Sequence, residues 1–476
     1  MTASEPEIID DGANVDVSSN ASGRMGIRHL QAFLLFLGMT IGYSMRVNMF
    51  VAIVAMANSS TANPDFEDYG WDADEKATIL SSFFWGYTVM QLPSGYLANV
   101  WSGQKLLASG VLICGVFNLL MQAAAHYGDV IAVCACRVGM GLSQSCLLPC
   151  IHTLLSKWVP PNERARLGTF AYAGAQFGTV FALPVSGWVA ASSLGWPFVF
   201  YIFGGLAIIW SILFFIFGAD SPSEHRSISI EEKSYIVQSL MIDQEIQEIS
   251  TEKLKVPWKS ILTSVPMWAI IITHCGQNWG YWMLLTGMPN FMNAILGYNI
   301  QKNGTMSALP YLVMWILSFP LSWLADFALR KGISRSIVRK ICNTMAFWGP
   351  AVALLVLGLE PGVKDTIAVA ILVVAVALNA GALCGFQINH IDLSPNFSGT
   401  MMSITNCLAS IVAVAEPLLV SKIITKETDA SQWSTVFFLS AGIYFTANLV
   451  FLIFGQAVVQ SWNDPKVKNH RTNEKM

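Results

Sequence analysis

Charged side chains are scarce in this sequence. Asp, Glu, Lys and Arg make up 12% of its 476 residues, against roughly 25% in a usual soluble domain. Hydrophobic residues reach 54%, which also excludes intrinsic disorder, because a disordered chain has few apolar residues and many charges. The net charge of −3 provides no basic surface for nucleic acid. This composition is typical of a multi-pass membrane protein.

Several motifs of other protein classes are missing. The first 28 residues are polar and acidic, unlike a signal peptide. The nine cysteines lie in apolar stretches without the spacing of a zinc site or a disulfide framework. The sequence contains no phosphate-binding Gly-x-x-x-x-Gly-Lys-Ser/Thr string, no repeated arginine spacing of a voltage sensor and no catalytic or metal-ligating cluster at mid-span. We therefore expect neither an ATP-driven pump, a voltage-gated channel nor an enzyme, and no bound cofactor or metal.

Twelve apolar segments are long enough to cross a bilayer as helices, which takes about 20 residues each. A polar gap after the sixth divides them into two sets of six. A short repeat supports this division, because span two ends in LPSGYLAN at 92–99 and span eight ends in FPLSWLAD at 319–326. We therefore expect an all-α integral membrane protein built from two six-helix halves. The spans run approximately over 30–56, 77–100, 106–125, 130–155, 170–191, 198–217, 266–292, 306–328, 341–359, 367–389, 399–424 and 436–457.

The charges in the loops orient these helices. With the N-terminus inside, the cytoplasmic segments hold 20 of the 27 Lys and Arg residues, the outer loops hold 5, and Arg46 and Arg137 lie within spans. This asymmetry follows the positive-inside rule and predicts that both termini are cytoplasmic. The expected organisation is a cytoplasmic tail at 1–28, a helical half at 29–217, a cytoplasmic linker at 218–264, a second half at 265–457 and a cytoplasmic tail at 458–476.

Two smaller signals concern the linker and the outer loops. Ser229, followed three residues later by Glu232, is the pattern of a capping box, which predicts a linker helix. Asn58 and Asn303 each begin an Asn-x-Ser/Thr acceptor string in a predicted outer loop. Both are therefore candidates for glycosylation.

Three side chains of the Asp, Glu, Lys or Arg type lie well within the spans: Arg46, Arg137 and Glu416. At 1.5 Å per residue, Arg46 lies about 15 Å and Arg137 about 10 Å from the outer helix ends, whereas Glu416 lies about 25 Å from the inner end. A charge at the centre of a span is costly and marks substrate or ion pathways. The planar guanidinium group binds carboxylate or phosphate with paired hydrogen bonds. We therefore predict an anion site at Arg46 and Arg137. The alternative is that each Arg holds helices together through carbonyl groups or polar neighbours such as Asn48 and Gln144.

Other polar residues at mid-span complete the candidate site. Histidine is the side chain that titrates near neutral pH, so His274 in span seven is a candidate for proton coupling, although a lone buried His more often makes only structural hydrogen bonds. The residues predicted to shape the pocket are Tyr87, Asn278, Tyr281 and Asn406. The alternative for each is a hydrogen bond between helices.

Several strings together resemble the anion:cation symporter family of the major facilitator superfamily, which includes sialin, the vesicular glutamate transporters and the type I sodium–phosphate cotransporters. The resemblance is strongest to sialin and to insect proteins named as inorganic phosphate cotransporters. It rests on YSMRVN at 43–48, SFFWGY at 82–87, WVPPNER at 158–164, YAGAQ at 172–176, NHID at 389–392 and ITN at 404–406.

The resemblance implies a twelve-helix major facilitator fold with alternating access, in which Arg46 and Arg137 bind substrate. It also implies a gating motif after span two that uses Gly95, Gly103 and Lys105. Asn99 replaces the usual acid of this motif, and Asp326 lies at the matching position of span eight. The sequence departs from the family pattern in span four, where Met140 and Gln144 replace two acids, so proton coupling by those acids is not expected. Leu80 and Gln277 differ from the residues at these positions in the vesicular glutamate branch. We therefore do not expect vesicular glutamate transport from this chain.

The sequence thus predicts a secondary active transporter of small anions, either organic anions or inorganic phosphate. Coupling to Na⁺ or H⁺ is expected, with His274 and Glu416 as candidate coupling residues. Two alternatives remain open: a potential-driven anion facilitator, and a transport-inactive receptor or scaffold that retains the fold. The expected partners are a small anion and the lipid bilayer, without nucleic acid, and the unit is expected to work as a monomer. The expected location is the plasma membrane or an endolysosomal or vesicle membrane.

Overall fold

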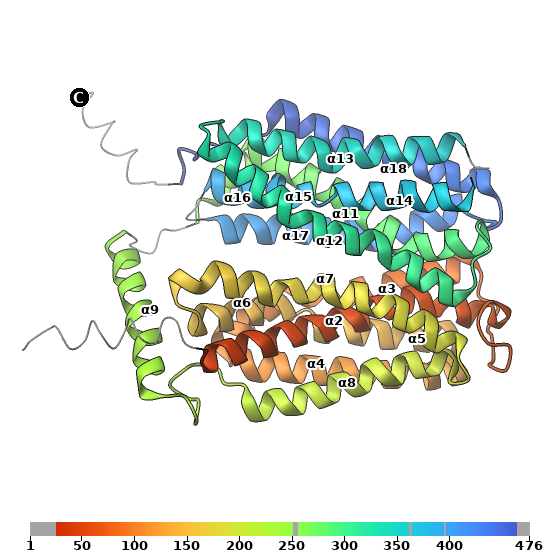
Figure 1. Cartoon of the computed structure of the whole chain (residues 1–476), viewed down its shortest axis with the longest axis horizontal. Coiled ribbons are helices and arrows are strands. Elements are labelled where there is room, and N and C mark those ends of the chain that lie inside the picture. Colours follow the sequence, from red (N-terminus) through yellow and green to blue (C-terminus); the bar gives the residue numbers. More distant parts are fainter. Residues whose placement is uncertain (1–24, 251–255, 361–363, 395–396, 464–476) are drawn as a thin grey trace, which may run out of the picture.

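The computed structural model describes residues 25–250, 256–360, 364–394 and 397–463, and in these ranges the regular structure is helical. The helices form two bundles that lie side by side (Figure 1). The N-terminal bundle contains α2 (Ile27–Ala57), α3 (Ala73–Val100), α4 (Gly103–Leu119), α5 (Met121–Gln144), α6 (Leu147–Trp158), α7 (Pro161–Ala191) and α8 (Gly195–Phe217). The C-terminal bundle contains α11 (Val265–Ala294), α12 (Ile300–Arg330), α13 (Arg335–Leu359), α14 (Asp365–Leu378), α15 (Gly381–Cys384), α16 (Phe386–Leu393), α17 (Ser398–Ile423) and α18 (Ala430–Phe454). The short turn η1 (Ser59–Thr61) follows α2, and α9 (Ile230–Ser250) and α10 (Trp258–Leu262) connect the bundles.

Two passes consist of broken helices. When the pieces of each are taken together, the helices make twelve passes, as the sequence predicts. The fourth pass is interrupted between α5 and α6, and the tenth is divided among α14, α15 and α16. Inside α5, Asp129 has a φ of 47° and a ψ of −147°, which breaks the helical path. Residues 121–128 therefore continue the third pass, and the fourth begins at 130, the predicted position. Broken helices are tolerated at membrane depth where they are buried in protein or line a cavity.

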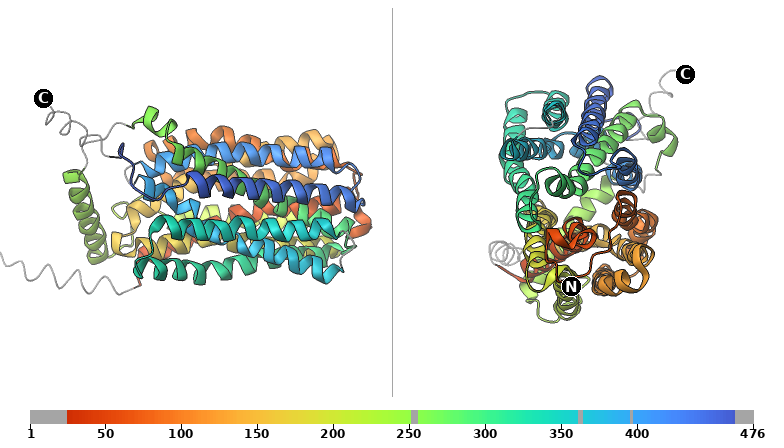
Figure 2. Two further views of the ribbon diagram at one scale, coloured as in Figure 1. Left: turned by 90° about the horizontal axis from the view of Figure 1, so that it is seen from above. Right: turned by 90° about the vertical axis from the view of Figure 1, so that its right-hand side faces the viewer.

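The two bundles meet at the end opposite α9 (Figure 1), and the view along the helices shows one bundle above the other (Figure 2, right). We call the end near α9 the inner end, because the loops there carry the predicted excess of Lys and Arg, and the opposite end the outer end. At the outer end, Gly187 of α7 packs directly against Gly304 of α12, so that a Cβ atom at Gly304 would lie 3.1 Å from the Cα of Gly187. This close contact depends on both residues lacking a side chain.

Ion pairs between the bundles lie at the same outer end. Lys76 Nζ of α3 is 2.5 Å from Glu427 Oε1, which follows α17. Lys422 Nζ of α17 is 2.6 Å from Asp74 Oδ2 of α3. The described structure is therefore closed on its outer side.

The linker is attached to the N-terminal bundle at the inner end. Glu232 donates its backbone N–H to Ser229 Oγ at 3.1 Å, as expected for the start of α9. Its carboxylate does not complete the predicted capping box. It accepts instead from the backbone N–H groups of Ile27 at 2.9 Å and Arg28 at 3.1 Å, and so caps α2. The Arg28 side chain also pairs with Glu232 at 3.0 Å and with Glu163 at 2.8 Å, which ties the linker to α2 and α7.

Candidate functional site

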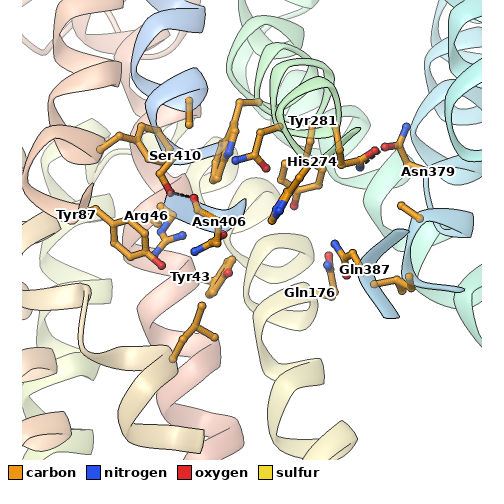
Figure 3. A pocket seen from close by; sticks show the side chains of 18 of the residues that line it. Tyr43, Arg46, Tyr87, Gln176, His274, Tyr281, Asn379, Gln387, Asn406 and Ser410 are labelled. Carbon is orange, nitrogen blue, oxygen red and sulfur yellow. Dashed lines mark hydrogen bonds between the residues drawn. The ribbon is translucent and has the colours of Figure 1, made fainter. Parts of the chain in front are cut away.

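A cavity of about 220 Å³ lies between the two bundles and is lined from both of them. Five of the six predicted substrate-binding residues line it, and so does the coupling candidate His274 (Figure 3). The predicted residues found there are Arg46, Tyr87, His274, Asn278, Tyr281 and Asn406. Further polar side chains in the wall, which the sequence analysis did not select as site residues, are Tyr43, Gln176, Gln277, Asn379, Gln387 and Ser410.

Arg46 contributes the positive charge of this cavity. Its side chain is 4% exposed, and its Nε donates to Gln144 Oε1 at 2.9 Å. The guanidinium carbon lies 4.6 Å from the ring centroid of Tyr43 and 4.8 Å from that of Tyr87. Among the described residues no carboxylate forms a salt bridge with Arg46. Its charge is thus stabilised by aromatic faces and a neutral amide. An anion in the cavity would be the first negatively charged group to pair with it.

Gln144 fixes the direction of the Arg46 side chain. Its amide nitrogen donates to the carbonyl oxygen of Gly42 at 2.7 Å, which leaves its oxygen to accept from Arg46. The same nitrogen also donates to Cys114 Sγ of α4 at 3.6 Å. Both donors of the amide are thus used, so the Gln144 oxygen has a fixed orientation. The predicted alternative of a structural bond between Arg46 and Gln144 is therefore present, and it coexists with exposure of Arg46 to the cavity.

Arg137 lies behind the cavity wall. It is 0% exposed, and none of its three guanidinium nitrogens has a hydrogen-bond partner among the described residues. Its guanidinium carbon is 5.1 Å from the ring centroid of Phe83, and that of Arg46 is 4.9 Å from the same ring. Both guanidinium groups therefore lie against the Phe83 ring, and of the two only Arg46 lines the cavity. Substrate binding by Arg137 stays a prediction, since its position supplies positive potential without contact with the cavity.

Replacing Arg137 by methionine is expected to raise the melting temperature of the purified protein while it weakens anion binding. Removal of a buried and unpaired charge stabilises the fold, by about 1–4 kcal/mol if the gain resembles that from replacing buried ion pairs. The loss of positive potential next to Arg46 should raise the KM for the anion about tenfold, which corresponds to about 1.4 kcal/mol. Thermal unfolding and uptake are measured on the same preparation. A lower melting temperature in Arg137→Met would show that the guanidinium has stabilising partners.

Glu416 lies outside the central cavity. It is 1% exposed, and its Oε2 is 3.5 Å from Thr286 Oγ1. It lines a separate pocket of about 50 Å³ at the outer end, together with Lys76 and Glu427. The depth predicted from the sequence agrees with this position. Because the pocket lies between α3 of one bundle and α11 and α17 of the other, Glu416 belongs to the outer contact between the bundles.

Loss of the ion pair above Glu416 is expected to open this outer contact. The side chains of Lys76 and Glu427 are only 9% and 29% exposed, so Glu427→Gln leaves a largely buried ammonium group without its partner. We expect uptake to fall about three- to tenfold, by the 0.7–1.4 kcal/mol that such factors represent. In Glu427→Gln, a reporter cysteine introduced by Ala77→Cys should react faster with an impermeant thiol reagent than it does when Glu427 is unchanged. The chain without this reporter is the blank. The exchanged pair Lys76→Glu/Glu427→Lys should restore uptake, and failure of Glu427→Gln to change either measurement would contradict a gating role.

The predicted gating loop after span two is anchored by a residue that the sequence analysis did not select. Asp220, which follows α8, accepts at Oδ1 from the backbone N–H of Gln104 at 3.2 Å and from Ser102 Oγ at 3.1 Å, and it pairs with Lys157. Burial acts to raise the pKa of Asp220, but these hydrogen bonds and the Lys157 charge outweigh it and hold that pKa below its ordinary value.

The other predicted gating residues surround this loop. Gly95 lies in α3, Gly103 is the first residue of α4, and the backbone N–H of Lys105 donates to Ser102 Oγ at 3.3 Å. The side chains of Asn99 and Asp326 lie outside the described part of the structure. Their gating roles stay predictions.

The two glycosylation candidates differ. Asn58 is exposed just after α2 and stays a candidate. Asn303 is 0% exposed, donates to the carbonyl oxygen of Pro289 at 2.7 Å and accepts from Ser307 at 3.0 Å. The prediction for Asn303 is not supported by the fold, because α12 already begins at Ile300 and leaves no room for a glycan on this buried amide.

Comparison with known proteins agrees with this architecture. Residues 34–417 match the family model described as Major Facilitator Superfamily. The chain is 40% identical to the Drosophila ananassae protein named "Putative inorganic phosphate cotransporter", over 91% of this chain and 93% of that protein. It is 36% identical to human sialin, over 91% and 90% of the two chains. A crystal structure of a bacterial homologue of the human lysosomal transporter Spinster, in an inward-facing and unoccupied conformation, superposes with a TM-score of 0.68 at 15% identity, over 91% of this chain and 99% of that one.

Proposed function

Because the chain belongs to the Major Facilitator Superfamily, and within it to the anion:cation symporter family of sialin, we propose that it is a secondary active transporter of small anions. The observation that carries the proposal is Arg46, a guanidinium group in the wall of a closed-outside central cavity without a carboxylate partner among the described residues. An anion that enters the cavity replaces water with paired, charge-assisted hydrogen bonds. The chemistry of Arg46 suits a carboxylate or a phosphate equally.

Transport proceeds by alternating access of the two bundles to this cavity. Closure at the outer end by the Lys76–Glu427 and Lys422–Asp74 pairs and by the Gly187–Gly304 contact supports an inward-facing assignment. In the opposite state these contacts separate and the inner ends of the bundles close. A bound anion shifts the balance between the two states only through its different affinity for each. The transporter works as a monomer, with both termini in the cytoplasm.

Coupling to a cation does not pass through the fourth helical pass. The side chains at the positions of the family acids are Met140 and Gln144, neither of which ionises. Symport therefore requires another proton or Na⁺ site. The same two residues favour the second candidate function, a facilitator that is driven by membrane potential alone.

Uptake into proteoliposomes tests these functions directly. The purified chain is offered inorganic phosphate, N-acetylneuraminate and glutamate, with H⁺, Na⁺ and voltage gradients imposed one at a time, and protein-free liposomes serve as the control. We expect at least one anion to accumulate against its gradient at zero voltage. Accumulation with voltage alone would instead identify a facilitator. Specific binding without counterflow of any anion would overturn the transporter assignment and indicate a receptor or scaffold.

A further inference from the structure

Three side chains of the C-terminal bundle form a hydrogen-bonded row that starts at the cavity. His274 Nδ1 of α11 lies 3.1 Å from Thr405 Oγ1 of α17, and His390 Nε2 of α16 lies 3.0 Å from the same oxygen. At the far end, His390 Nδ1 lies 2.9 Å from the carbonyl oxygen of Gln387. The three side chains belong to residues that are 4%, 0% and 2% exposed, respectively. Bulk water therefore reaches the row mainly through the cavity, which His274 lines.

The acceptors at the far end of the row determine where its protons lie. The Gln387 carbonyl can only accept, so His390 Nδ1 carries a hydrogen. A neutral His390 then has a bare Nε2, which is one of two acceptors for the single hydroxyl hydrogen of Thr405, the other being the Met402 carbonyl oxygen. The Thr405 oxygen is in turn free to accept from His274, so His274 carries its hydrogen on Nδ1. The remaining ring nitrogen of His274, Nε2, is a bare acceptor on the residue that lines the cavity.

We propose that His274, Thr405 and His390 form the proton site that couples cation movement to anion transport, an inference that rests on the function proposed above. A proton from cavity water binds His274 Nε2, the Nδ1–H proton passes to Thr405 Oγ1, and the hydroxyl proton of Thr405 passes to His390 Nε2. One N–H or O–H bond forms for each one that breaks. The net result is one added proton, whose charge rests on His390. The Met402 carbonyl, 3.1 Å from Thr405 Oγ1, competes for the hydroxyl proton and offers a position in which the row is interrupted.

The charges around the row explain why a proton and an anion bind together. Arg46 of α2 lines the same cavity, and Arg137 of α5 lies against the same Phe83 ring as Arg46, without a hydrogen-bond partner among the described residues. A third positive charge is therefore unfavourable while the cavity holds no anion. An anion at Arg46 offsets this repulsion. By reciprocity, a proton on the row favours the anion by the same free energy.

The remaining neighbours of the row change its charge little. At its inner side, Arg339 of α13 pairs with Asp392 of α16 at 2.7 Å, and this pair is neutral overall. The other titratable side chains in the cavity wall are tyrosines, Tyr87 of α3 and Tyr281 of α11 among them. Phe386 covers the other side of His274, with 5.2 Å between the ring centroids. The anion therefore remains the main variable charge near the row.

The position of the row suits coupling better than that of Glu416. His274 faces the central cavity, which opens to each side of the membrane in turn under alternating access. Glu416 lies in the outer contact between the bundles, where separation of α3 from α17 exposes it to the outside alone. A proton on Glu416 would thus return to the side from which it came.

A matched pair of substitutions at Thr405 tests the relay. Thr405→Val has nearly the same shape but no hydroxyl group, whereas Thr405→Ser keeps the hydroxyl. The probe is N-acetylneuraminate or glutamate in proteoliposomes, since both carboxylates stay ionised between about pH 5.5 and 7.5. With one proton per anion, a gradient of one pH unit at zero voltage drives about tenfold accumulation, because one pH unit is equivalent to 1.36 kcal/mol. We expect this accumulation in the unchanged chain and in Thr405→Ser, and its loss in Thr405→Val.

Anion exchange at equal pH on both sides separates the possible outcomes. Exchange needs no net proton movement, so we expect it to persist in Thr405→Val and to show that the variant is folded. His390→Gln gives a second test with the same expectation, which decides the matter if Thr405→Val does not fold. Gradient-driven accumulation that survives in both variants would overturn the relay, as would its absence from the unchanged chain while exchange proceeds. Absence of exchange of N-acetylneuraminate, glutamate and inorganic phosphate alike in the unchanged chain would instead refute the proposed transport function.

Discussion

Replacing Arg46 by alanine is expected to reduce anion uptake about a hundredfold. A hydrogen bond to a charged group contributes about 1.5–3 kcal/mol, and a loss of about 2.7 kcal/mol corresponds to a factor of one hundred. The effect should be large here because, among the described residues, Arg46 is the only arginine in the cavity wall. Initial rates over a range of anion concentrations in proteoliposomes measure it.

Two further substitutions separate charge from geometry at this site. Arg46→Lys keeps the positive charge but loses the planar fork and the Nε bond to Gln144, so we expect an intermediate loss of about tenfold. Arg335→Ala removes an exposed arginine at the inner end and should leave uptake unchanged. Uptake by Arg46→Ala at the level of the unchanged chain would remove the basis of the anion site. Equal losses in Arg46→Ala and Arg335→Ala would indicate a general effect of net charge.

The sequence predicts the depth of a residue in the membrane better than it predicts the direction of its side chain. Depth follows from counting residues along an apolar span, and this placed Glu416 near the outer end, where the structure has it. Direction depends on the rotation of each helix against its neighbours. Arg46 and Arg137 both count as mid-span cations, and both lie against the Phe83 ring, but only Arg46 lines the cavity.

The sequence pattern does not predict contacts between segments that lie far apart along the chain. His274 was a candidate by its type and depth, but the row through Thr405 to His390 joins three helices whose packing no periodicity specifies. The Glu232 carboxylate is similar: the local pattern predicted a bond to its own helix, whereas the folded chain brings α2 close enough to compete for it. Asn303 was assigned to a loop because hydropathy locates the apolar part of a span, and helices extend beyond that part.

Changing Gln144 to glutamate is expected to make uptake depend on acidic pH. The new carboxylate would occupy the place of an amide whose oxygen lies 2.9 Å from Arg46 Nε. An ionised glutamate there neutralises Arg46 and competes with the anion, so we expect a KM at least about tenfold higher at pH 7.5, equivalent to about 1.4 kcal/mol. When the pH falls and this carboxyl group takes up a proton, Arg46 regains its net charge. Anion affinity should then approach that of the unchanged chain.

Gln144→Met is the matched control for this charge, because it removes the hydrogen bond to Arg46 without adding an ionisable group. Exchange is measured at equal pH on both sides, from about pH 5.5 to 8, so that a proton gradient across the membrane does not contribute. Gln144→Met should lower affinity to a similar extent at every pH, since only the orientation of Arg46 is lost. Gln144→Glu should lower it chiefly at the alkaline end. The same pH profile in both variants would mean that the neutral amide at this position does not set the charge available to the anion, and that Arg46 is balanced by some other group.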